Sequence, residues 1–153
     1  MKIICESTIQ EIVAYAKKHW PDESCGLLIG QKGQNSVSEF IPIKNIYNDM
    51  HEKYPDQYPR TAKTAYLIDP KEQQRVFDEA EKNGQEVKCI YHSHCEHDAY
   101  FSEEDRLVAA PWGEPSYPGI SYLVVSIYNR ELKEINEFYW SDDSKSFEQK
   151  KII

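Results

Sequence analysis

The segment EVKCIYHSH, Glu86–His94, constrains the fold of this 153-residue chain more than any other stretch. It gathers apolar, β-branched and aromatic residues over the length of a strand, directly after the helix-stop pair Asn83-Gly84. Such a segment is typical of a strand in the core of a sheet. Its carboxyl end carries His92 and His94, so we expect two imidazoles at the point where a buried strand ends.

The rest of the chain alternates between strand and helix patterns. Helices are expected from the capping sequence Ser7-Thr8 to about His19, from Asp69-Pro70 to Asn83-Gly84, and in SEEDRLVAA. Strands are expected at KIIC, SCGLLIG, SVSEFIPIKN, TAYLID, ISYLVVSIY and KEINEFYW, with the second and third, and the last two, forming hairpins. The stretch from Ile46 to Arg60 has no periodicity and is expected to be a long surface loop.

This order of elements, β-α-β-β-β-α-β-(α)-β-β, predicts an α/β fold with a mixed central β-sheet flanked by two main helices. The length fits a single domain, residues 1–153, that can bury a core without staples. Because 40% of the residues are hydrophobic and 29% are charged, long disordered segments are not expected.

Charge and hydropathy exclude some partners and compartments. A net charge of −8 disfavours nucleic acid and anionic membrane surfaces, since both repel an acidic protein. No run approaches the roughly 18 apolar residues of a membrane span. The N-terminal MKIICESTIQ is too short in apolar residues for a signal peptide. A cytoplasmic protein with four free cysteine thiols is therefore expected.

The two histidines of the core strand are candidate metal ligands. His92 and His94 are two residues apart, so their side chains leave the same face of the strand. Neutral imidazole suits zinc, and a catalytic zinc takes three protein ligands and leaves one position open. Asp105 is the candidate third ligand, because Ser102 caps its helix and that helix packs back toward the strand end. The alternative is two polar residues at a strand terminus and a carboxylate that only favours the helix dipole.

The full spacing is more specific than a lone His-x-His. His92-Ser93-His94 is followed by seven residues, Ser102, two residues and Asp105, and Glu23 stands shortly before the apolar strand GLLIG. This pattern resembles the JAMM signature of the MPN+ metalloprotease family, zinc isopeptidases that include the proteasomal and signalosome deubiquitinases and small prokaryotic relatives. The resemblance covers most of the chain. It implies a single MPN (JAMM) domain, related to the cytidine-deaminase-like architecture.

The resemblance also implies a role for each motif residue. His92, His94 and Asp105 would be zinc ligands, Glu23 the general base, and Ser102 a hydrogen-bond donor to the tetrahedral intermediate. Zinc can lower the pKa of bound water toward about 7, and Glu23 can take the water's proton and pass it to the leaving amine. Ser102 can stabilise the developing oxyanion, or it can serve only as the helix N-cap.

Two further features concern the surroundings of this site. Cys95 stands where the family often has proline, either as an inert loop cysteine or as a redox-sensitive zinc ligand. In the family's layout the loops Ile46–Arg60 and Pro111–Gly119 flank the site. Their aromatic residues either form the walls of a narrow groove or pin the loops to the core.

The resemblance predicts a zinc-dependent metallo(iso)peptidase that uses zinc-activated water. Its expected partner is a ubiquitin-like or sulfur-carrier protein, whose amide bond after a C-terminal Gly-Gly it would hydrolyse. Two alternatives stay open, a catalytically silent MPN scaffold that only binds proteins and a narrower small-peptide metallopeptidase. Silent scaffolds have degraded ligands, whereas all five motif positions are intact here, which favours the enzyme.

Overall fold

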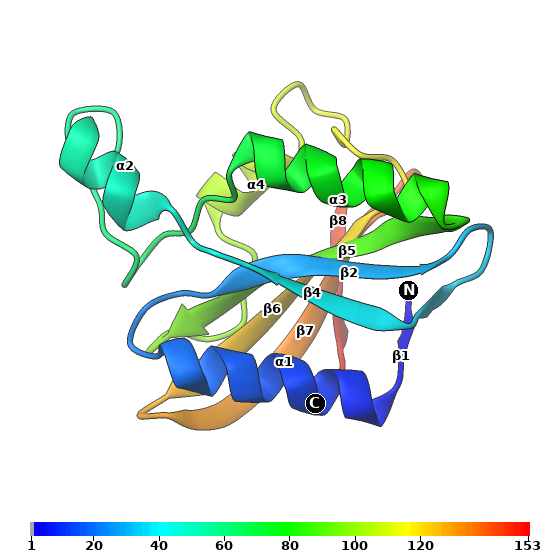
Figure 1. Ribbon diagram of the computed structural model, residues 1–153, viewed down its shortest axis with the longest axis horizontal. Helices are drawn as coiled ribbons and strands as arrows, with labels where there is room; N and C mark the ends of the chain where they lie inside the picture. Colours follow the sequence, from blue (N-terminus) through cyan, green and yellow to red (C-terminus); the bar gives the residue numbers. More distant parts are fainter. Residues whose placement is uncertain (1) are drawn as a thin grey trace.

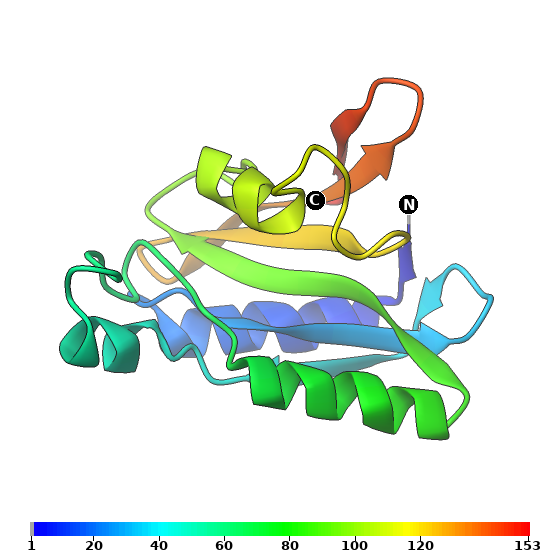
Figure 2. The ribbon, with the colours of Figure 1, turned by 90° about the horizontal axis from the view of Figure 1, so that it is seen from above.

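The computed structural model describes residues 2–153 as three layers, with one sheet between α1 and the pair α3 and α4 (Figure 1). Figure 2 shows the same layers from above, with α2 beyond one end of the sheet. The helices of the described residues are α1 (Glu6–His19), α2 (Tyr47–Lys53), α3 (Pro70–Lys82) and α4 (Glu103–Ala109). The strands are β1 (Ile3–Ile4), β2 (Cys25–Gln31), β3 (Ser36–Val37), β4 (Glu39–Ile43), β5 (Gln85–Cys95), β6 (Ser121–Tyr128), β7 (Glu131–Ser141) and β8 (Ser146–Lys151).

The main sheet is mixed, as predicted. Its strand order is β4-β2-β5-β6-β7-β8, in which β5 and β6 run parallel and the other neighbours are antiparallel. The two predicted hairpins, β2 with β4 and β6 with β7, are confirmed. The first strand pairs with β3 in a separate two-stranded parallel piece. Strand β5, which ends in the two histidines, is thus an interior strand.

The two long helices form because each has one apolar face and a clear start or stop. Helix α1 buries Ile9, Ile12 and Ala16 against the sheet. Helix α3 begins at Asp69, whose Oδ1 accepts a hydrogen bond from the Lys71 N–H at 2.9 Å. None of the helices within residues 2–153 is both long and apolar enough to cross a membrane.

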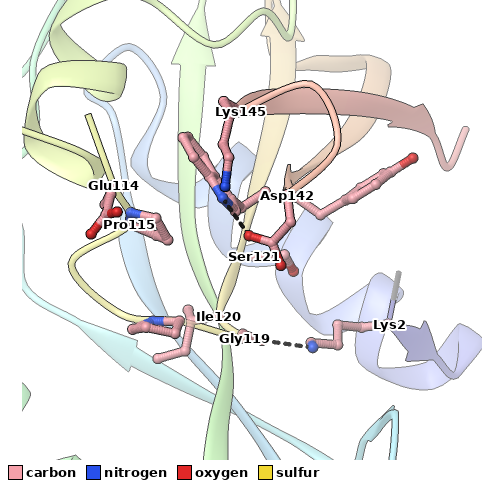
Figure 3. Close-up of a pocket in the computed structure, with 11 residues that line it drawn as sticks. Lys2, Glu114, Pro115, Gly119, Ile120, Ser121, Asp142 and Lys145 are labelled. Carbon is pink, nitrogen blue, oxygen red and sulfur yellow. Dashed lines mark hydrogen bonds between the residues drawn. The ribbon is translucent and has the colours of Figure 1, made fainter.

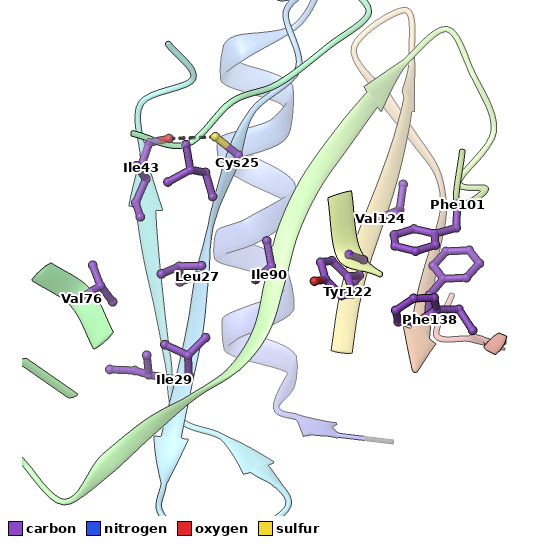
Figure 4. Packing of buried hydrophobic residues seen from close by; sticks show 14 of the residues in the cluster. Cys25, Leu27, Ile29, Ile43, Val76, Ile90, Phe101, Tyr122, Val124 and Phe138 are labelled. Atoms are coloured by element: carbon purple, nitrogen blue, oxygen red, sulfur yellow. Dashed lines mark hydrogen bonds between the residues drawn. The ribbon is translucent and has the colours of Figure 1, made fainter. Parts of the chain in front are cut away.

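Alternation along β5 divides the core into two clusters. Ile90 faces the α3 side together with Leu27 and Val124, as Figure 4 shows, whereas Tyr91 packs on the α1 side. Because side chains alternate, His92 and the residue two further on share the face of Ile90. Leu27 is fully buried, so truncating it to alanine should cost about 2–5 kcal/mol of unfolding free energy.

Two sequence predictions about elements were wrong, and one strand was missed. Residues 46–60 are not all loop, because Tyr47–Lys53 form α2. The segment TAYLID is not a strand and makes one isolated bridge, between Asn45 and Ile68. The closing hairpin is extended by a third strand, β8, which pairs with β7 and buries Phe147.

Candidate metal centre and catalytic site

The three predicted metal ligands meet at one point. The Nε2 atoms of His92 and His94 lie 3.2 Å apart. Oδ2 of Asp105 lies 3.4 Å from the first of these nitrogens and 3.9 Å from the second. Ligand atoms about 2.0–2.2 Å from a tetrahedral ion are about 3.3–3.6 Å from one another. The three residues can therefore hold one metal ion between them.

Strand β5 and helix α4 bring these ligands together. Both histidines share a face of β5 with Ile90, which packs with residues of α3 and α4, because alternate side chains of a strand lie on one face. Asp105 lies in the first turn of α4, where Ser102 Oγ accepts a hydrogen bond from the Asp105 N–H at 3.0 Å. In return, Asp105 Oδ2 accepts from the Ser102 N–H at 3.0 Å. This capping box starts the helix and orients the metal-facing carboxylate.

Hydrogen bonding sets the tautomer of His94. Its Nδ1 lies 2.7 Å from the main-chain carbonyl oxygen of Asp98, so Nδ1 carries the proton and donates. Its Nε2 then has a lone pair facing Asp105 and His92. Burial, and then the neighbouring His92, lower the pKa of His94 to about 4. The imidazole is therefore neutral at neutral pH, as metal binding requires.

Glu23 lies beside the candidate metal ligands because β2 and β5 are antiparallel neighbours. Cys25 pairs with His92 in this ladder, and the Ser93 N–H donates to the carbonyl oxygen of Ser24 at 2.9 Å, so the chain just before β2, which carries Glu23, runs alongside the end of β5. Glu23 is 5% exposed, and its N–H donates to the carbonyl oxygen of Ala62 at 2.6 Å. The general base that the sequence predicts is thus a buried carboxyl next to the histidine pair.

The two carboxyl groups of the site have opposite pKa shifts. Burial, and then the charge of Asp105, raise the pKa of Glu23 well above its ordinary value. Burial also acts to raise the pKa of Asp105, but His92 and hydrogen bonds from Ser102 hold it below the usual range. Asp105 is therefore ionised, whereas Glu23 can carry a proton. This division of roles suits a metal ligand beside a proton carrier.

Comparison with known proteins decides the family. The family model described as prokaryotic homologs of the JAB domain matches residues 6–141. The chain belongs to this family. The matched range includes both β5 and α4, which supply the three candidate ligands of this JAB domain.

Two curated proteins are similar to this JAB domain. The CysO-cysteine peptidase of Mycobacterium tuberculosis is 27% identical over 151 residues, which cover 99% of this chain and 90% of that protein. The desampylase of Haloferax volcanii is 32% identical over 106 residues, which cover 69% of this chain and 63% of that protein. The relatives of this JAB domain thus include a peptidase.

Solved structures confirm the fold. A protein from Desulfitobacterium hafniense has a TM-score of 0.71 at 26% identity, covering 100% of this chain and 92% of that one. A JAB1/MPN domain protein from Archaeoglobus fulgidus has a TM-score of 0.52 at 19% identity, covering 97% and 94%. The predicted MPN fold, with its mixed sheet, is therefore confirmed.

Two residues that support the site have no signal in the sequence. Tyr66 stacks on His92, with ring centroids 4.3 Å apart and planes at 15°. Asn45 Nδ2 donates to the carbonyl oxygens of Glu23 at 2.9 Å and Ala65 at 3.1 Å. Asn45 therefore joins the chain at Glu23 to the segment that carries Tyr66. Neither residue lies in a helix or strand, although the sequence predicted strands that include both, so no pattern indicated these contacts.

Arg60 is a third residue that the sequence did not indicate. Its Nη2 lies 2.5 Å from Oε1 of Glu104, the residue before Asp105 on α4. Its Nη1 donates to the carbonyl oxygen of Thr64 at 3.1 Å. Arg60 also acts electrostatically on Glu23, whose pKa it lowers against the larger effect of burial. The connection after α2 thus places a cation beside the site.

Cys95 faces away from the metal ligands of the JAB domain. It follows His94 on β5, so its side chain projects to the opposite sheet face. There its Sγ donates to the carbonyl oxygen of Asp22 at 3.3 Å. Burial raises the pKa of this thiol to about 12. The structure favours an inert buried cysteine over a redox-sensitive ligand.

The aromatic residues of the two flanking loops differ in their surroundings. Tyr47 and Tyr58 contact each other edge to face, with ring centroids 5.6 Å apart, and so tie α2 to the turn that follows it. Trp112, in contrast, is 91% exposed, and Tyr54 is also exposed. The Trp112 side chain therefore does not pin its loop to the core.

A separate pocket of about 510 Å³ lies between residues 114–121 and the turn that joins β7 to β8 (Figure 3). Lys2 closes one side of it, with its Nζ donating to the carbonyl oxygen of Gly119 at 2.7 Å. Ser121 lines the pocket and pairs with Cys89, near the start of β5 rather than its end. The metal ligands are not among the lining residues, so this pocket is not the candidate catalytic site.

Proposed function

We propose that this JAB domain is a zinc-dependent peptidase that hydrolyses the amide bond after the C-terminal Gly-Gly of a ubiquitin-like or sulfur-carrier protein. The observation that carries the proposal is the meeting of His92, His94 and Asp105 with the buried Glu23 beside them. Two imidazoles and one carboxylate are a donor set that suits zinc and leaves room for a fourth ligand. A zinc ion held there would supply Lewis-acid chemistry, activating water and polarising a carbonyl.

The chain's own residues can handle the protons of the reaction. Glu23 has a raised pKa, so its carboxylate can accept a proton from the attacking water and its carboxyl form can deliver it to the leaving amine. Ser102 uses an Oγ lone pair for the Asp105 N–H, which leaves its hydroxyl hydrogen free to stabilise the developing oxyanion. Tyr66 covers one face of His92 and excludes water from that side.

The named relatives support a tailed protein as the substrate. The two curated relatives are a CysO-cysteine peptidase and a desampylase. The CysO-cysteine peptidase is similar over 99% of this chain. A comparable substrate here would be a carrier whose Gly-Gly tail is blocked by an added group.

The surface around the site supports a protein substrate over a short peptide. Leu107, Val108 and Trp112 are 58%, 72% and 91% exposed, and all three follow the Asp105 ligand within seven residues. We call these three residues the α4 apolar patch. Large exposed apolar side chains close to a site are a feature of protein-binding surfaces. A small-peptide hydrolase would not need such a patch.

The test is mass spectrometry of a sulfur-carrier protein ending in Gly-Gly-Cys after incubation with the zinc-loaded domain. We expect a single product, the carrier ending in Gly-Gly, and no product after treatment with a chelator. Restored cleavage on adding zinc would support the metal assignment. An intact carrier in the presence of a full zinc complement would favour the silent scaffold instead.

A further inference from the structure

Arg60 lies where it can meet the part of the substrate that leaves. Its segment runs alongside the proposed base, since the Glu23 N–H donates to the carbonyl oxygen of Ala62 at 2.6 Å. Its guanidinium reaches α4 at Glu104, one residue before the ligand Asp105. Arg60 therefore links the segment beside Glu23 to the first turn of the helix that carries Asp105.

The acidic surroundings make this cation distinctive. Asp105 and Glu104 both act on Glu23 with negative charge, and Arg60 is the cation that opposes their effect. The other nearby arginine, Arg106 of α4, lies over the ring of Phe101 at 5.6 Å from its centroid. A substrate anion that approaches these acidic residues would be attracted chiefly by Arg60.

The Arg60–Glu104 pair can exchange partners at little cost. The two side chains are 44% and 58% exposed, so water already solvates both charges. Exposed ion pairs contribute little to stability, and an arginine fork binds a carboxylate in two parallel hydrogen bonds. Glu104 therefore holds a position that a substrate carboxylate can take over or share.

The chemistry of the reaction decides which carboxylate this would be. Hydrolysis breaks the C–N bond after the second glycine: water supplies the hydroxyl of the new glycine carboxylate and the proton of the leaving amine. Glu23 delivers that proton, so the leaving amine must lie next to Glu23. In a leaving amino acid the α-carboxylate is attached to the carbon that bears this amine. It would therefore lie on the same side of the site as Arg60.

We propose that Arg60 binds the free α-carboxylate of a single amino acid that leaves from the Gly-Gly tail. This proposal rests on the proposed function and narrows its substrate. The domain would then prefer to release one C-terminal residue from a carrier over cleaving an isopeptide bond to a protein lysine. In an isopeptide the carbon next to the leaving amine bears no carboxylate, so the substrate offers Arg60 no anion to bind.

The experiment compares two semisynthetic carriers, one ending in Gly-Gly-Cys with a free carboxylate and one ending in Gly-Gly-Cys carboxamide. For the zinc-loaded wild type we expect kcat/KM to be about 10- to 100-fold higher for the acid, the range of a hydrogen bond to a charged group. Arg60→Gln should bring this acid-to-amide ratio close to one, mainly through a higher KM for the acid. Because the ratio compares two substrates of one variant, a general folding defect does not change it.

Two variants serve as controls. Arg75→Gln removes an exposed arginine of α3 that pairs with Glu72 and Glu79, and it should leave the ratio at the wild-type value. Glu104→Gln removes the competing carboxylate and should keep the ratio at or above wild type. A collapse of the ratio in Glu104→Gln would contradict the proposal.

The remaining outcomes separate this inference from the proposed function. Equal cleavage of the acid and the amide by the wild type would overturn the role of Arg60 and leave the peptidase proposal standing. An Arg60→Gln variant that loses activity on both substrates with the ratio retained would show a purely structural residue. Failure to cleave either carrier with zinc bound would overturn the proposed function, and this inference with it.

Discussion

Asp105 serves the candidate metal site and its own helix with one side chain. Its Oδ2 lies 3.4 Å from His92 Nε2 and accepts a hydrogen bond from the Ser102 N–H at 3.0 Å. A neutral amide could still accept that hydrogen bond, but it would offer a metal no charge. The two roles can therefore be separated by one conservative substitution.

We predict that Asp105→Asn folds but binds zinc more than about 100-fold more weakly, since two imidazoles alone hold the ion poorly. Zinc content per chain after dialysis is the measurement. Asp78→Asn is the matched control, because this exposed carboxylate lies on α3 and accepts a hydrogen bond from Gln74 Nε2 at 2.9 Å. Full zinc retention by Asp105→Asn would remove Asp105 from the ligand set.

The cysteines should differ sharply in reactivity. Side-chain hydrogen bonds with Ser7 and then Thr8 lower the pKa of Cys5 to about 7, and this thiol is exposed. Its thiolate form, and hence its alkylation rate, should fall as the pH drops below about 7. Cys95, the last residue of β5, is buried and should react only on unfolding. Rapid labelling of Cys95 in the native protein, seen by peptide mass spectrometry, would revive its interpretation as a redox-sensitive ligand.

The ligand residues could be predicted from the sequence, whereas their supports could not. Strand alternation places His92 and His94 on one face and the N-cap at Ser102 fixes the start of the helix, and the resemblance to the JAMM signature adds Asp105 to the set. Tyr66 and Arg60 come from the connection between β4 and α3. Neither residue lies in a helix or strand of that connection, so the contacts of both depend on tertiary structure.

Helix α4 combines a buried chemical end with an exposed apolar surface. It begins at the capping box that orients Asp105, and its one buried side chain among the described residues is Ala109. Leu107 and Val108, on the same helix, are exposed. The element is therefore suited to hold a ligand at its start and contact a partner along its length.

We predict that Val108→Asp raises KM about tenfold for a carrier substrate, because one charge in an apolar interface commonly costs more than 1 kcal/mol. Hydrolysis of a short peptide ending in Gly-Gly-Cys should stay unchanged, since it does not reach the α4 apolar patch. Ile3→Asp is the control, because this residue is equally apolar and 64% exposed but lies on β1. Equal losses for the carrier and the peptide would argue against protein docking on α4.

At the scale of elements, sequence patterns predicted the elements that bury much of their surface and missed two that bury little. Helices α1 and α3 carry apolar stripes, and β2, β5 and β6 are buried through most of their length. Helix α2 has no buried residue, so there was no stripe to find. In β8 only Phe147 is buried, and its pairing with β7 rather than its own sequence makes it a strand.

The whole molecule brings its chemistry together across two layers. The histidines belong to the sheet and Asp105 to a helix that covers it, so a metal bound by all three would join the layers. Because α4 buries little of its own surface, this join should contribute to the stability of the fold.

We predict that zinc stabilises the wild type by about 4 kcal/mol at a free concentration of 1,000 times its Kd. A rise in Tm with zinc concentration, followed by calorimetry, is the readout. The rise should be much smaller in Asp105→Asn, because a 100-fold higher Kd leaves only about 1.4 kcal/mol of stabilisation at the same zinc concentration. An equal rise in both proteins would place the zinc elsewhere on the chain.

The central claim is that Glu23 moves protons beside a zinc ion held by His92, His94 and Asp105. The most direct measurement determines zinc content and carrier hydrolysis on the same sample of Glu23→Gln. We predict about one zinc per chain, as in wild type, with hydrolysis slowed about 10² to 10⁴-fold, because the amide cannot accept the proton of water. Hydrolysis near the wild-type rate with zinc bound would contradict this account.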